Sequence, residues 1–289
     1  MPQPNTTDTD CVAHGGGLRA TVRRLPRWLE VALFFALSVF LVNIIGIPMT
    51  LSLASIDTLN LLVPVMQFTP FLAALIMFWI IAPGRFRDVF ATRRAGALRW
   101  SAIGVGLIAL VAAVQLGVAL LTGTWRLAPV EAFVGLLPVL VAVLVMQSAF
   151  AIGEEFGWRG WLVDRVGRWG FWRLSLAFMP LLMVWHLPVL ATLSSESTFD
   201  KVIYFLSMGP WAPLLFALRL RSGSVWPAVL AHGAINSVRV YLLQSVPANP
   251  TDSVWIEVLG WVLLLAVAAW LMRPSVRRTI PELSRPGIG

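Results

Sequence analysis

The sequence predicts an all-α fold, a polytopic transmembrane helix bundle with about eight spans. Of its 289 residues, 58% are hydrophobic and only 12% are charged, and the mean hydropathy is +0.81. Soluble domains carry about 25% charged residues. The apolar runs also reach the length of about 20 residues that a helix needs to cross a bilayer. A chain with these properties is expected to be solvated by lipid.

The apolar runs define the expected elements in chain order. Residues 1–27 form a polar, basic tail that we expect to be disordered, and residues 273–289 form a second short tail. Between them, residues 28–272 are expected to form the transmembrane bundle. Its eight predicted spans are residues 28–49, 60–82, 99–122, 132–158, 173–193, 201–218, 224–244 and 253–272.

The basic residues give an independent test of this count. The net charge is +8, and eight spans place nineteen of the 22 lysines and arginines on one side of the membrane. Cytoplasmic loops are the ones enriched in arginine and lysine. We therefore expect a multi-pass protein of a prokaryotic cell membrane, with both termini in the cytoplasm and residues 194–200 outside. The position of the arginines in short loops argues against nucleic acid as a partner.

Several charged and polar residues lie inside the predicted spans, where they are costly and functional by default. They are Glu154, Glu155, His186, His232 and Asn236. Glu154 lies eleven residues from Arg165, His186 thirteen from Arg173 and His232 eleven from Arg221, all of them arginines expected on the cytoplasmic side. At about 1.5 Å of rise per residue these side chains would share one depth and could meet in the bundle, provided that Gly157 and Gly160 do not break the helix.

The spacing of these residues along a helix gives the two adjacent glutamates different directions. Glu155 and Arg159 are four residues apart and can pair on one helix face, whereas Glu154 is rotated by about 100° and can point elsewhere. The pair would also suit a helix-end ion pair near the cytoplasmic interface. His232 and Asn236 are likewise four apart and should face one site. Other polar residues of the spans are interpreted as interfacial or interhelical contacts: Glu30, Asn43, Gln67, Gln147, Arg239 and Glu257.

Three motifs in order carry a family resemblance. Glu154-Glu155-Phe156-Gly157-Trp158-Arg159 resembles the EExxxR motif of the CAAX prenyl protease type 2 family, also called the CPBP or Abi family. His186 in Trp-His-Leu-Pro resembles its second motif, and His232-xxx-Asn236 its third. The resemblance covers about residues 99–243. One departure is Leu182, where the second motif often has phenylalanine, and we expect this residue to pack near the site.

The resemblance implies an intramembrane endopeptidase with a peptide or protein substrate, which is lipid-modified where the processing is of the CAAX type. Eukaryotic members remove three residues from prenylated CAAX proteins, and many bacterial members are linked to bacteriocin maturation or immunity. Carried over by motif, Glu154 is the general base with His186 as its partner, and His232 and Asn236 stabilise the oxyanion. Glu155 and Arg159 support the site.

The cofactor and two other functions stay open at this point. Glu154, His186 and His232 would make a His₂Glu set for zinc or another divalent metal. They come from three helices without the HExxH spacing, however, and a metal-free glutamate mechanism is equally consistent. The single cysteine, Cys11, adds no zinc cluster. A non-catalytic immunity or scaffold protein would tolerate loss of Glu154. A proton-coupled transporter could use the same groups but is expected to show internal repeats, which the sequence lacks.

Overall fold

The computed structural model describes residues 25–52, 64–81, 85–92, 95–166, 169–190, 197–238 and 254–273. Within these ranges the chain is helical and forms no β-strand, which confirms the all-α prediction. The predicted tails, apart from residues 25–27 and 273, lie outside the described residues, as do Arg239 and residues 191–196. Each of the eight predicted apolar segments contains a helix.

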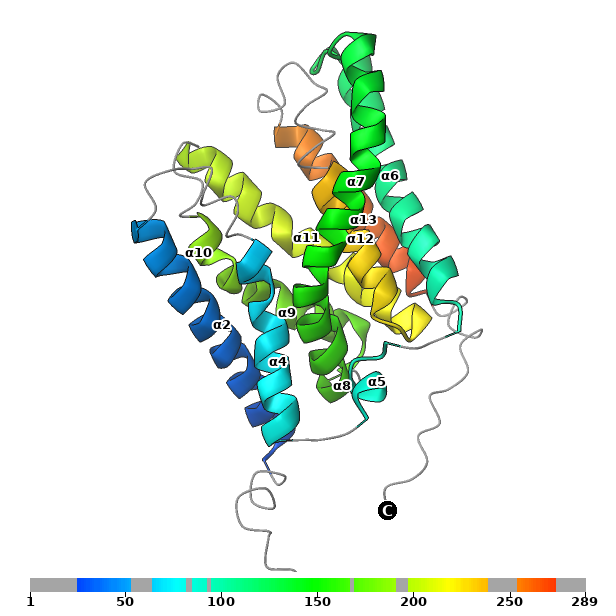
Figure 1. Ribbon diagram of the computed structural model, residues 1–289. Coiled ribbons are helices and arrows are strands. Elements are labelled where there is room, and N and C mark those ends of the chain that lie inside the picture. Colours follow the sequence, from blue (N-terminus) through cyan, green and yellow to red (C-terminus); the bar gives the residue numbers. More distant parts are fainter. Residues whose placement is uncertain are drawn as a thin grey trace, which may run out of the picture.

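The described helices run in chain order from α2, in blue, to α13, in orange and red (Figure 1). They are α2 (Arg27–Ser52), α4 (Thr69–Ile80), α5 (Phe86–Val89), α6 (Ala97–Leu121), α7 (Val130–Glu155), the π-helix η1 (Phe156–Trp161), α8 (Leu162–Val166), α9 (Phe171–Trp185), α10 (Leu187–Leu190), α11 (Thr198–Ser222), α12 (Trp226–Asn236) and α13 (Val254–Leu271).

Five of the described helices are long and apolar enough to cross a membrane. They are Arg27–Gly46, Ala97–Leu121, Pro138–Val166, Lys201–Ser222 and Val254–Leu271. Pro64–Ile80 and Phe171–Trp185 are shorter apolar helices, and α12 is shorter still. The structure therefore supports a polytopic bundle, while the count of eight spans stays a prediction.

The distribution of polar and apolar side chains matches a lipid environment. Leu121 is 89% exposed and Val145 67%, whereas Glu154 is 3% exposed and Arg159 2%. Water would favour the opposite arrangement, because it solvates charge and excludes hydrocarbon. Lipid tails solvate the outer apolar side chains at no such cost, and the polar groups of the centre contact one another.

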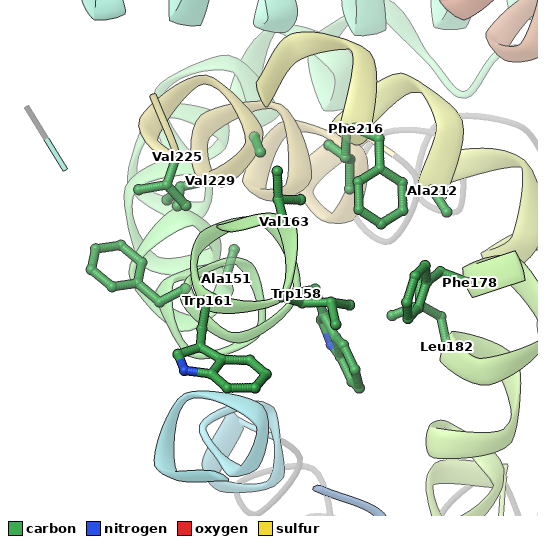
Figure 2. Close-up of a cluster of buried hydrophobic side chains, with 14 of the residues drawn as sticks. Ala151, Trp158, Trp161, Val163, Phe178, Leu182, Ala212, Phe216, Val225 and Val229 are labelled. Atoms are coloured by element: carbon green, nitrogen blue, oxygen red, sulfur yellow. The ribbon is translucent and has the colours of Figure 1, made fainter. Parts of the chain in front are cut away.

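The α7–η1–α8 segment is one continuous helical rod. Its first turns project beside α6, and its second half runs through the centre of the bundle (Figure 1). Gly157 and Gly160 do not break it; instead, residues 156–161 form a π-helix. Trp158 and Trp161 in this segment are fully buried and pack against Phe34 of α2. Figure 2 shows the surrounding apolar cluster. π-turns in α-helices occur frequently at functional sites.

The packing order brings the three motif-bearing segments together. Helix α12 packs against α7 and α6, and α11 packs against α9 and α13. Helix α4 packs against both α7 and η1, and α2 packs against α4. The diglutamate segment thus has α4 and α12 as neighbours, so side chains from several helices can contribute to one site around it.

The arrangement leads to a topology prediction. The start of α2 and the short helices α5 and α8 lie at one end of the bundle (Figure 1), as the arginine alternation requires. Reporter fusions after Arg94 and Arg278 should report the cytoplasm, and a fusion after Ser197 should report the outside. An external signal from Arg94 or Arg278 would contradict the predicted eight-span orientation.

Candidate active site

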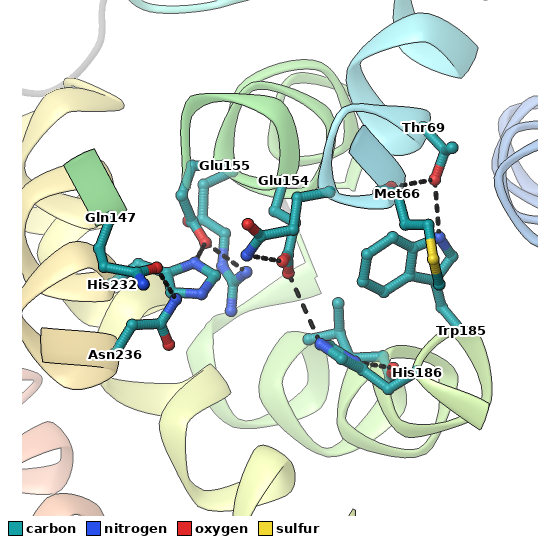
Figure 3. A network of polar contacts seen from close by, with 12 residues as sticks. Met66, Thr69, Gln147, Glu154, Glu155, Trp185, His186, His232 and Asn236 are labelled. Atoms are coloured by element: carbon teal, nitrogen blue, oxygen red, sulfur yellow. Dashed lines mark hydrogen bonds and ion pairs between the residues drawn. The ribbon is translucent and has the colours of Figure 1, made fainter. Parts of the chain in front are cut away.

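Glu154 lies near the end of α7 and is buried between two other segments. Its Oε1 accepts a hydrogen bond from Gln67 Nε2 at 3.0 Å, just before α4. Its Oε2 lies 3.8 Å from His186 Nε2. That separation exceeds a direct hydrogen bond and suits a bridging water. The two oxygens of Glu154 therefore have different neighbours (Figure 3).

The sequence predicted His186 inside a helix, but the structure places it at the C-cap of α9, where that helix ends. Pro188 has no N–H to donate to a carbonyl of the preceding turn, so the hydrogen-bond ladder of α9 is interrupted here and a new short helix, α10, begins at Leu187. The imidazole turns back on this end, with Nδ1 2.7 Å from the carbonyl oxygen of Leu182. A carbonyl only accepts, so Nδ1 carries the proton, and Nε2 of the neutral ring is left as an acceptor facing Glu154. Leu182 is buried beside it.

Glu155 forms a separate cluster with Arg159 and His232. Arg159 Nη1 donates to Glu155 Oε1 at 3.0 Å, and His232 Nδ1 lies 2.8 Å from the same oxygen. The Arg159 and Glu155 side chains are 3% and 0% exposed. The predicted pairing of Glu155 with Arg159 is confirmed. Residues 156–161 continue the rod beyond Glu155 as a π-helix, and the distance of the pair from the membrane interface stays a prediction.

Further contacts hold Arg159 in the centre. Arg219 of α11 donates from Nε to the Arg159 carbonyl at 2.8 Å. The guanidinium of Arg159 lies 4.6 Å from the centre of the Phe216 ring, within the range of a cation–π contact. A buried arginine with these partners links the π-helix to α11 as well as to Glu155.

Asn236 lies one turn after His232, at the end of α12. Its Nδ2 donates to Gln147 Oε1 of α7 at 3.4 Å, a long hydrogen bond. Both predicted members of the third motif thus face α7, but they contact different residues on it. The amide nitrogen of Asn236 has a second hydrogen that this contact does not use.

Two glutamines that the sequence indicated only as interhelical contacts prove to be neighbours of the site. Gln67 bonds to Glu154, and Gln147 bonds to Asn236. Sequence reasoning missed a further link, in which Trp185 Nε1 donates to Thr69 Oγ1 at 3.2 Å. The only feature of the sequence that pointed to this link is the position of Trp185 directly before His186.

Close backbone contact at two glycines explains how Gln67 reaches Glu154. A Cβ at Gly153 would lie 2.5 Å from the carbonyl oxygen of Gln67, and a Cβ at Gly157 would lie 2.6 Å from Pro70. The two glycines are four residues apart, on one face of the rod. Small residues at this spacing let membrane helices approach closely. The sequence holds this signal within the diglutamate motif itself.

The side chains as placed do not fit a preformed His₂Glu zinc site. Zinc ligands in such sites converge at about 2.0–2.2 Å from the metal. Here His232 Nδ1 is engaged by Glu155, while Glu154 faces Gln67 and His186. Within the described ranges, no group of three or more His, Cys, Asp and Glu is arranged to hold a metal ion.

The site lies within the part of the chain that is similar to a known family. Residues 135–238 match the family model for type II CAAX prenyl endopeptidase Rce1-like proteins. This match confirms the resemblance inferred from the motifs and includes all of Glu154, Glu155, Arg159, His186, His232 and Asn236. No curated protein matches the chain. At the level of the family, the match supports a membrane-embedded, CAAX-type endopeptidase.

Proposed function

We propose that this protein is an intramembrane endopeptidase that cleaves a prenylated, CAAX-type peptide with water activated by Glu154 and His186. The observation that carries the proposal is the pair of acceptors, Glu154 Oε2 and His186 Nε2, which lie 3.8 Å apart within the family-matched segment, the first on a buried and the second on a partly buried side chain. Peptide hydrolysis needs such a base close to a water molecule.

The proposed reaction begins with a water that donates to both acceptors. Its oxygen attacks the scissile carbonyl carbon while Glu154 takes one proton. The carbonyl oxygen becomes an oxyanion, the C–N bond then breaks, and the proton moves from Glu154 to the leaving amine. One product carries a new carboxylate and the other a new amino group, so the general base is restored.

His232 and Asn236 are the proposed oxyanion donors. The second amide hydrogen of Asn236 is available for this role. With Nδ1–H directed at Glu155, His232 can donate from Nε2 only as the doubly protonated ring, and its charge would then lie beside the Glu155 carboxylate. Donors aimed at the developing charge are usually the largest single contribution to such catalysis.

Proteoliposomes containing the purified protein test the function. We expect loss of the last three residues from a peptide whose cysteine is prenylated, and no cleavage of the same peptide without the prenyl group. Cleavage of a bacteriocin-type precursor alone would redirect the substrate assignment. Mass spectrometry of the products identifies the cut bond, and Glu154→Ala provides the inactive control.

The same assay tests the proposed absence of a metal requirement. Exhaustive chelation should leave cleavage unchanged, and elemental analysis should find no stoichiometric zinc. Activity that is lost on chelation and restored by zinc, with zinc lost in His186→Ala and His232→Ala, would overturn the metal-free mechanism without removing the protease assignment.

A further inference from the structure

We propose that Gln67 is a positioning residue for the catalytic base, holding one oxygen of Glu154 so that the other faces His186. The inference rests on the proposed function of Glu154. Its starting point is the 3.0 Å hydrogen bond from Gln67 Nε2 to Glu154 Oε1, next to the 3.8 Å approach of Glu154 Oε2 to His186.

The bond to Gln67 makes the two carboxylate oxygens different. Without it, rotation about the last side-chain bond would let either oxygen, or neither, face His186, because terminal sp³–sp² torsions have broad energy wells. With it, Oε1 is occupied and Oε2 is directed at the water site. General-base catalysis depends on this geometry first.

The amide of Gln67 is also a suitable hydrogen-bond donor to a general base such as Glu154. Glu155, one residue later, is bonded to the cationic Arg159, which compensates its charge. Glu154 is bonded instead to a neutral amide, which satisfies one oxygen without supplying a positive charge. The two adjacent glutamates thus have partners that match different tasks, proton transfer for Glu154 and structural support for Glu155.

The backbone around Gln67 is held from two sides. The turn that carries it lies against Gly153, where a Cβ would meet the Gln67 carbonyl oxygen at 2.5 Å. On the other side, Thr69 donates to the Met66 carbonyl at 2.8 Å and accepts from Trp185, the residue before His186 (Figure 3). The same turn therefore contacts the segments of both members of the Glu154–His186 pair.

Gln115 provides a matched control. It is a buried glutamine whose Nε2 donates to the Ile256 carbonyl at 2.9 Å and joins α6 to α13, away from the site. Gln67→Met and Gln115→Met each remove one interhelical donor at nearly constant volume. A structural role alone predicts that both lower the unfolding midpoint and leave kcat per folded molecule unchanged.

The experiment measures kcat, KM and the unfolding midpoint for both variants in proteoliposomes. We expect Gln67→Met to lower kcat by about 10- to 100-fold with KM within about twofold, as for misplacement of a catalytic group. Gln115→Met should keep the wild-type kcat. Gly153→Ala gives a second route, because it moves the turn while keeping Gln67; it should also lower kcat. Gly106→Ala, where a Cβ meets no atom within 4 Å, should not.

The outcomes separate this inference from the proposed function. Wild-type kcat in Gln67→Met or in Gly153→Ala, with Glu154→Gln inactive, overturns the positioning role alone. If Gln67→Met does not fold, Gly153→Ala and Gly106→Ala test the positioning role instead: a kcat that is equal in the two variants overturns it, and a lower kcat in Gly153→Ala supports it. Activity retained by Glu154→Gln overturns the proposed base, and the role of Gln67 with it.

Discussion

Glu154→Gln should abolish cleavage while the protein stays folded. The substitution keeps the size of the side chain, and the new amide oxygen can still accept from Gln67, so little packing is lost. It removes the carboxylate that faces His186, which is the proposed proton acceptor. Loss of a general base typically costs about 10²–10⁴ in rate, and the slow background of peptide hydrolysis makes this a loss of detectable product.

The measurement is product formation per folded molecule, with the unfolding midpoint of each sample taken in the same detergent. His186→Ala should also be slow, since it removes the second acceptor of the proposed water site. Full cleavage by Glu154→Gln would contradict the role of Glu154 as the base. Absence of cleavage by the wild-type protein, with peptide binding retained, would favour the non-catalytic scaffold alternative.

Glu155→Gln and Arg159→Ala should instead lower stability and activity together. Breaking a buried ion pair by removing one partner strands the other charge, which costs about 3–5 kcal/mol. Both side chains are almost fully buried, and Glu155 also contacts His232, so the loss should spread to the third motif. Thermal and denaturant unfolding, together with yield in the membrane, measure the effect.

A double-mutant cycle supplies the control. Glu155→Gln combined with Arg159→Ala removes both charges, so it should be less destabilised than the sum of the single changes. If all three single variants, Glu154→Gln, Glu155→Gln and Arg159→Ala, lost activity and stability to the same extent, the two glutamates would not have the separate roles inferred here.

Much of this protein could be predicted from the sequence. Hydrophobic runs of membrane-spanning length indicated the all-α bundle, because a backbone in lipid must satisfy its own hydrogen bonds. The spacing of Glu155 and Arg159 predicted their pairing, since residues four apart share a helix face. The 100° step to Glu154 predicted its different direction. These are local consequences of helix geometry.

The tertiary structure decided the partners of those side chains. Helical rise could suggest a common depth for Glu154, His186 and His232, but no spacing within one helix specifies which imidazole meets which glutamate. Packing of α12 against α7 directs His232 to Glu155, and the end of α9 at His186 directs its ring to Glu154. The close contact of Gly153 with the Gln67 backbone, between segments distant in the chain, brings an amide to the carboxylate. Such contacts depend on the approach of whole helices, which local sequence patterns do not determine.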